Sequence, residues 1–161
     1  MSHNPLRLSP LRIELHEFES INISASTVAE PNGAHNLRTN RSFKQIDENG
    51  LQHKITLTVE IVAENSEDPC PYTGSVTVVG YFTIAENYPE NKRKDLIEIT
   101  GSSILYGACR EMITNLTARS SHGILSLPSI SFMPNKAVKK KTAAKKVGKK
   151  TVKKKSTKKK A

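Results

Sequence analysis

The 161-residue sequence contains no tryptophan, two cysteines and only 5% aromatic residues. Cys70 and Cys109 are too few for a disulfide framework, and the five scattered histidines add no metal-ligand spacing. No apolar run approaches the roughly 20 residues of a membrane-spanning helix, and residues 1–11 contain no apolar stretch of signal-peptide length. We therefore expect free thiols, no metal, no cofactor, no membrane span and a cytoplasmic location.

Enzyme motifs are also missing. Gly101, Gly107 and Gly123 do not have the spacing of a phosphate-binding or dinucleotide-binding loop, and no serine lies between the glycines of a nucleophile elbow. Cys109 lies on an apolar helical stripe, where a cysteine is more often a small core residue than a nucleophile. The sequence therefore predicts no catalytic residue and no enzymatic activity.

Negative charge is absent from the last part of the chain. Residues 135–161 contain 14 lysines and no acidic residue. Removing these 14 from the 25 basic residues leaves 11 basic against 15 acidic residues, a net charge of −4 for residues 1–134. Lysine mixed with alanine, valine, threonine and glycine cannot bury enough apolar surface to fold. We therefore predict one folded domain over 1–134 and a disordered tail over 135–161.

Two interpretations of this tail remain open. Its lysines can neutralise phosphates without sequence preference, as in non-specific nucleic-acid or polyanion binding, or dock on an acidic protein or membrane surface. The tail has no aromatic residue for base stacking and no arginine for bidentate base contacts. The alternative is a solubilising appendage that repels like charges. The candidate polyanion-binding residues are Lys139, Lys140, Lys141, Lys145, Lys146, Lys149, Lys150, Lys153, Lys154 and Lys155.

Alternation of apolar and polar residues predicts four strands in the first half of the chain. They cover residues 11–25, 37–46, 55–63 and 76–85. Phe18 interrupts the odd-numbered apolar positions of the first strand, which include Leu11, Leu15 and Ile21, so we predict a bulge or kink near Phe18. Asn32-Gly33 and Asn49-Gly50 are typical turn sequences.

The fourth predicted strand has apolar residues on both faces. One face carries Val76, Val78, Phe82 and Ile84, and the other carries Val79, Tyr81 and Ala85. A chain of this length has few elements left to cover the second face of an antiparallel sheet. We expect another copy of the chain to cover it. The alternative is a cover made by the chain's own loops.

A helix is predicted over residues 103–121. Its apolar positions, Leu105, Ala108, Cys109, Met112, Ile113 and Leu116, recur with helical spacing. Pro89 is interpreted as a stop signal before a charged stretch at 91–95. Pro128 and Pro134 exclude a continuous helix in 124–133, so that segment is predicted to be extended along the helix or the sheet. The predicted class is α+β, a four-stranded antiparallel sheet with one long helix.

The run Ile104–Ile113, with Leu116, Arg119 and then Leu125–Phe132, resembles the C-terminal signature of the SecB family of export chaperones. The resemblance extends over residues 11–132. It implies an ATP-independent holdase for non-native polypeptides or preproteins. It also implies a homo-oligomer, a dimer or a dimer of dimers, with an export motor or an antitoxin as a partner.

Candidate client-binding residues follow from that resemblance. They are Tyr106, Met112, Ile113, Leu125, Leu127, Ile130, Phe132 and Met133. Most of them fit a hydrophobic core equally well. The competing hypothesis is a nucleic-acid-associated protein that acts through its lysine tail.

Overall fold

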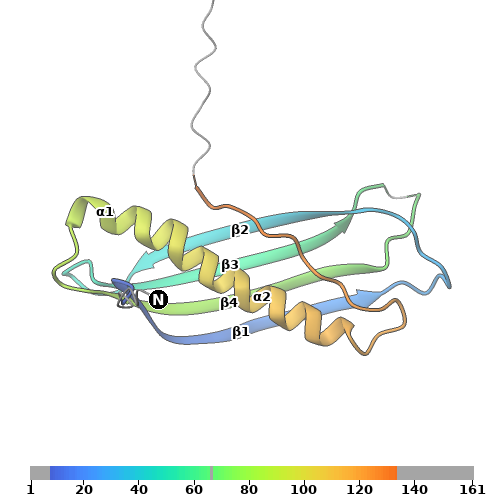
Figure 1. Cartoon of the computed structure of the whole chain (residues 1–161), viewed down its shortest axis with the longest axis horizontal. Helices are drawn as coiled ribbons and strands as arrows, with labels where there is room; N and C mark the ends of the chain where they lie inside the picture. Colours follow the sequence, from blue (N-terminus) through green and yellow to red (C-terminus); the bar gives the residue numbers. More distant parts are fainter. Residues whose placement is uncertain (1–7, 66, 134–161) are drawn as a thin grey trace, which may run out of the picture.

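A long helix crosses one face of a four-stranded antiparallel sheet in the computed structural model of the chain (Figure 1). The structure describes residues 8–65 and 67–133. Its strands are β1 (Leu11–Ala25), β2 (His35–Gln45), β3 (Gln52–Ala63) and β4 (Tyr72–Ile84). The sheet order is β1-β4-β3-β2, so β1 and β2 form the two edges. The predicted fold class is confirmed, whereas the predicted tail at 135–161 lies outside the described residues.

Two register shifts divide β1 into three parts. They lie between Ile13 and Leu15 and between Phe18 and Ser20. Each shift inserts one extra residue and reverses which positions face the helix, because side chains alternate along a strand. Phe18 and Ile21 therefore lie on the same face, as the pairing of Phe18 with Val78 and of Ile21 with Val76 shows.

The predicted bulge near Phe18 is confirmed, but the prediction missed the first shift. It therefore placed Leu15 on the core face. Leu15 pairs with Tyr81 on the opposite face of the sheet and is 54% exposed.

The helix begins earlier than predicted. It consists of α1 (Glu90–Asp95), a π-helical turn η1 (Leu96–Gly101) and α2 (Ser102–Thr117). Pro89 was interpreted as a stop signal, but it is the N-cap of α1 and marks the start of the helix. Proline's fixed φ suits this position. Glu90 at the start of α1 complements the positive end of the helix dipole.

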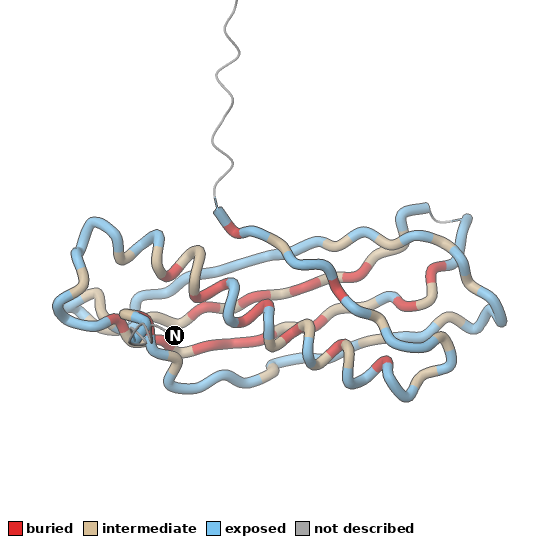
Figure 2. The backbone as a smooth tube through the Cα atoms, viewed as in Figure 1, coloured by how far each residue is buried: buried red, intermediate tan, exposed pale blue. Residues whose placement is uncertain are grey.

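The core lies between the helix and the two central strands (Figure 2). Odd-numbered residues of β3 and even-numbered residues of β4 face α2, among them Ile55, Leu57, Val78 and Phe82. Gly80 allows α2 to approach β4 closely: a Cβ at this position would lie 2.7 Å from Leu105 Cδ2. The sheet and the helix therefore share one continuous apolar layer.

The other face of the sheet is mostly polar, and the single chain already covers Val79 there, so cover of β4 by a second copy stays a prediction. Val79 is only 3% exposed in the single chain, between its cross-strand neighbours Glu17 and Thr56. Lys54 Nζ lies 5.9 Å from the centre of the Tyr81 ring. Threonines and serines fill much of the remainder of this face. We call the face opposite the helix, which carries the even-numbered residues of β3 and the odd-numbered residues of β4, the open face.

We predict opposite effects for two glycine substitutions. Gly74 has φ +141°, and a Cβ on it would lie 1.9 Å from the Asn22 carbonyl oxygen on β1. Gly74→Ala should therefore push β1 away from β4 and lower the free energy of unfolding by at least about 1 kcal/mol. Gly107 is an exposed position inside α2, and a Cβ there would have open space around it, with no neighbouring heavy atom within 4 Å. Gly107→Ala should therefore raise the free energy of unfolding by about 0.5–1 kcal/mol, because alanine favours the helix more than glycine does. Urea unfolding followed by circular dichroism measures both, and equal stabilities would contradict the described β1–β4 pairing.

Candidate functional site

The extended segment 124–133 runs back beside α2 over the helix face of the sheet (Figure 1). Side chains of α2 hold its backbone in place. The Tyr106 hydroxyl donates a hydrogen bond to the Pro128 carbonyl at 2.6 Å, and Arg110 Nε donates to the Leu127 carbonyl at 3.0 Å. Since Tyr106 and Arg110 are four residues apart, they lie on one row of the helix surface. We call this row of bonds the backbone clamp.

The clamp continues toward the end of the helix. The Thr117 hydroxyl accepts a hydrogen bond from the Leu125 N–H at 2.9 Å and donates one to the Ile113 carbonyl at 2.8 Å, and Thr117 is fully buried. At the turn after α2, the Tyr72 hydroxyl donates to the Gly123 carbonyl at 2.6 Å. An extended segment without strand partners thus has several of its carbonyls satisfied by side chains, as a partly buried backbone requires.

The predicted client-binding residues lie in three environments. Tyr106, Ile113, Leu127 and Phe132 are buried in the core of the single chain. Leu125 and Ile130, in the extended segment, are half-buried against the core, and Met133 at its end is exposed. Met112 is half-buried on the other side of α2, toward β1. Client binding by these eight residues stays a prediction, and Met133 is the most accessible of them.

An apolar groove lies between α2 and β1. One part of about 210 Å³ has Phe18, Ala108 and Met112 in its lining, and a second part of about 310 Å³ is lined by residues that include Ile21 and Leu116. Ile104, Ala108, Met112 and Leu116 follow one another at four-residue spacing along α2. Ile104 and Leu116 are exposed, so the helix has a second apolar row besides the one buried in the core.

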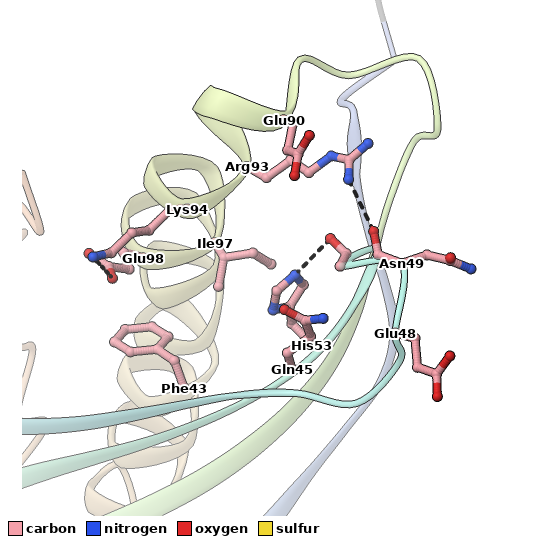
Figure 3. Close-up of a pocket in the computed structure, with 11 residues that line it drawn as sticks. Phe43, Gln45, Glu48, Asn49, His53, Glu90, Arg93, Lys94, Ile97 and Glu98 are labelled. Carbon is pink, nitrogen blue, oxygen red and sulfur yellow. Dashed lines mark hydrogen bonds and ion pairs between the residues drawn. The ribbon is translucent and has the colours of Figure 1, made fainter.

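A cavity of about 440 Å³ lies between the turn joining β2 to β3 and the start of the helix (Figure 3). Phe43 and Ile97 form its apolar part. Arg93 Nη1 donates to the Asn49 carbonyl at 3.1 Å and joins the helix to the turn, and Lys94 lies 3.7 Å from a Glu98 carboxylate oxygen. Most of the lining is therefore polar or charged, and its apolar part is confined to Phe43 and Ile97.

Arg41 connects this cavity to the extended segment. Its guanidinium carbon lies 5.7 Å from the centre of the Phe43 ring and 4.8 Å from that of Phe132, and its Nη1 donates to the Glu98 carbonyl at 3.1 Å. Phe43 and Arg41 therefore lie beside Phe132, the neighbour of Met133 in the chain. We call the exposed side chains of this region, Arg41, Phe43 and Met133, the β2-side surface. Sequence analysis did not find it, because these residues are far apart in the chain and Phe43 is a lone aromatic in a polar strand.

Both cysteines are free and lie in the interior of the chain. Burial raises the pKa of the Cys109 thiol to about 12, and both cysteines are buried. Among residues 8–65 and 67–133, no group of three or more His, Cys, Asp or Glu side chains is placed to hold a metal ion. No helix in that part of the chain is both long and apolar enough to span a membrane.

A model of a known protein family matches most of the chain. The family model for the preprotein translocase subunit SecB matches residues 12–141. The chain belongs to the SecB family. This family and its SecB-like members support a chaperone role, which agrees with a site made of apolar surfaces. The lysines from Lys145 onward lie beyond the match.

Solved structures share the fold at low sequence identity. A SecB-like chaperone of Mycobacterium tuberculosis, in complex with a ChAD peptide from the HigA1 antitoxin, matches with a TM-score of 0.59 and 15% identity, over 75% of this chain and 91% of that one. A protein of unknown function from Streptococcus agalactiae matches with a TM-score of 0.44 and 15% identity, over 74% of this chain and 97% of that one. A search of curated proteins finds no match.

We predict that the backbone clamp holds the extended segment on the helix. Thr117→Val removes the acceptor of the Leu125 N–H and lowers the free energy of unfolding by about 1–3 kcal/mol, whereas Thr117→Ser keeps the hydroxyl and costs less. Tyr106→Phe loses one hydrogen bond, about 1 kcal/mol. Urea unfolding measures the three variants. A Thr117→Ser variant as unstable as Thr117→Val would assign the effect to packing and not to the hydroxyl.

The reactivity of Cys109 gives a second test of the site. In a Cys70→Ser variant, Cys109 is the remaining thiol, and with a pKa of about 12 and no exposed surface it should not react with Ellman's reagent at pH 8. The same variant should react fully in 6 M guanidinium chloride. Rapid reaction of the native protein would show that α2 separates from the sheet, in contradiction to the described packing.

Proposed function

We propose that this SecB-family chain is an ATP-independent holdase that binds non-native polypeptides, among them preproteins, in the cytoplasm. The exposed β2-side surface of Phe43 and Met133 is the observation that carries the proposal. It joins an apolar cavity floor to the end of a segment that runs over the sheet. Flexible methionine and aromatic side chains accept many partner sequences, which suits a chaperone.

The edge strand β2 supports binding of extended chains. Eleven residues long, it pairs with β3 without a register break, and its other edge has no partner among the described residues. An extended client can therefore add main-chain hydrogen bonds along β2 while its apolar side chains contact Phe43. The antitoxin peptide bound to the Mycobacterium tuberculosis chaperone supports an antitoxin as a second class of client in this proposal, besides preproteins.

We assign the groove between α2 and β1 to self-association. The apolar row on α2 is regular and about as long as the helix itself, and it suits a rigid helix of a second copy better than variable clients. The dimer and the dimer of dimers implied by the family resemblance both need such a surface. In this proposal the work is non-covalent, with no catalytic step.

A pair of variant sets separates the two surfaces. Phe43→Gln with Met133→Gln should raise the chaperone concentration needed to suppress citrate synthase aggregation at 43 °C without ATP by at least about 30-fold, because about 1–3 kcal/mol of apolar contact is lost per large side chain. The molar mass should stay unchanged. Ile104→Glu with Leu116→Glu should reduce the molar mass measured by light scattering. Ile46→Gln, at a position 50% exposed, is the matched control for loss of an exposed apolar group.

The outcomes decide between the assignments. Full suppression by the Phe43/Met133 variant would remove the β2-side surface from the proposal. An unchanged molar mass of the Ile104/Leu116 variant would remove α2 from the self-association surface. If the unaltered chain fails to suppress aggregation at a near-stoichiometric ratio, the holdase proposal itself fails.

A further inference from the structure

The edge strand β2 has a regular pattern of main-chain groups that point away from β3. At one end of the strand the Ile46 N–H donates to the Gln52 carbonyl at 2.9 Å, and at the other end the Glu64 N–H donates to the Ala34 carbonyl at 2.9 Å. Both bonds continue the β2–β3 register, so the even-numbered residues of β2 bond to β3. The odd-numbered residues therefore direct their N–H and C=O groups to the edge that has no partner in the described part of the chain (Figure 1).

The side chains beside this edge alternate between the two faces of the sheet. Arg41 and Phe43 lie on the helix side, with the guanidinium carbon 5.7 Å from the centre of the ring. Lys44 lies on the open face, opposite Lys54. Arg41, Phe43 and Lys44 are all exposed. A strand added at this edge places its side chains directly opposite them, so it meets an apolar ring and one positive charge on the helix side and a second positive charge on the open face.

The positive charges of this region have no carboxylate partner among residues 8–65 and 67–133, where the ion pairs lie elsewhere. Arg41 Nη1 donates to the Glu98 carbonyl, which leaves other N–H donors of the guanidinium for a ligand. Lys44 and Lys54 are direct register partners, and like charges at such positions destabilise a sheet. A carboxylate opposite Lys44 would offset this repulsion, and another opposite Arg41 would accept its remaining hydrogen bonds.

The edge strand β1 has the opposite properties. Two register shifts interrupt its ladder, and it carries Glu14, Glu17 and Glu19. Bulges and charges of this kind discourage pairing with a further strand, and the glutamates repel an acidic one. β2, in contrast, has no register shift and no acidic residue. An acidic segment is therefore directed to β2, and the proposed self-association along α2 and β1 leaves that edge accessible.

We propose that the chain selects extended client segments with the order acidic, apolar, any residue, acidic, and binds them as an antiparallel strand on β2. This inference rests on the proposed holdase function and names its class of client. The first acidic residue lies opposite Lys44, the apolar residue opposite Phe43 and the second acidic residue opposite Arg41. The antiparallel direction continues the pattern of the whole sheet and is slightly more stable per residue than the parallel one.

The test measures binding of fluorescein-labelled peptides of twelve residues to the full chain by anisotropy in 150 mM KCl. The first peptide contains glutamate, phenylalanine, serine and glutamate in that order, and two others replace both glutamates with glutamine or with lysine. We expect the acidic peptide to bind at least about threefold more tightly than the glutamine peptide and at least about tenfold more tightly than the lysine peptide.

A fourth peptide controls for general attraction between charges. Residues 135–161 contain 14 lysines and attract any acidic peptide, whatever the order of its residues. The control therefore has the composition of the acidic peptide but places both glutamates at one end. Because it cannot put one carboxylate opposite Lys44 and another opposite Arg41, it should bind at least about threefold more weakly than the acidic peptide.

A matched pair of double variants tests the two charges of β2. Arg41→Gln with Lys44→Gln should remove the advantage of the acidic peptide over its rearranged control. Lys92→Gln with Arg119→Gln removes the same charge from exposed positions outside β2 and should change that advantage less than twofold.

Main-chain pairing gives a second readout, from amide hydrogen exchange followed by nuclear magnetic resonance. Saturation with the acidic peptide should slow exchange of the Thr39, Arg41 and Phe43 N–H groups at least about tenfold, because these groups point to the edge where the peptide binds. The Asn40 and Ser42 N–H groups already bond to β3 and should change less. A peptide held by charge alone would leave both sets unchanged.

Three results would overturn the inference: equal binding of the acidic peptide and its rearranged control, equal effects of the two double variants, or no slowing of exchange at the odd-numbered N–H groups. Aggregation suppression by the same proteins is measured in parallel. Suppression without selection among the peptides would keep the holdase function and reject the class of client. Selection on β2 by a chain that suppresses no aggregation would reject the holdase function alone.

Discussion

The close approach of α2 to β4 is the constraint on which the rest of the molecule depends. A Cβ at position 80 would lie 2.7 Å from Leu105 Cδ2, so glycine gives Leu105 room against the strand, and Leu105, Cys109 and Ile113 share one apolar layer. Once α2 lies there, Tyr106 and Arg110 face the carbonyls of the extended segment. The position of that segment then brings Phe132 against Arg41, beside Phe43, so the proposed client surface depends on the packing of one helix.

The fold could be predicted from sequence wherever one periodicity dominates. β3 and α2 each bury a single regular stripe, and their alternation and helical spacing were sufficient to identify them. The faces of β1 were harder to predict, because two bulges lie within a few residues of each other. After each bulge, the core-facing residues change from odd-numbered to even-numbered positions or back. The start of the helix was missed because Pro89 is compatible with both a helix beginning and a chain break, and α1 buries no residue that would reveal a stripe.

The candidate site was less predictable than the fold. Tyr106 and Phe132 were identified as client-binding candidates from a family resemblance, and the structure places both in the core, 6.0 Å apart between ring centres. Large apolar residues on one helix do not reveal which of them a later segment will cover. Phe43 and Ile97 come together because the start of the helix packs on the sheet, where Ile97 joins the core and Arg93 bonds to the β2–β3 turn across 44 positions of sequence. Such contacts between residues far apart in the chain leave no periodic pattern in the sequence from which they could be predicted.

The π-helical turn η1 has a geometrical consequence for the evolution of this surface. A turn with one more residue than an α-helical turn changes the azimuth of everything before it by about 100°. Deleting a single residue from 96–101 would leave a regular helix and the same strands, yet Arg93 and Lys94 would point away from the hairpin. Relatives that differ by one codon at this place would therefore keep the architecture and lose the cavity.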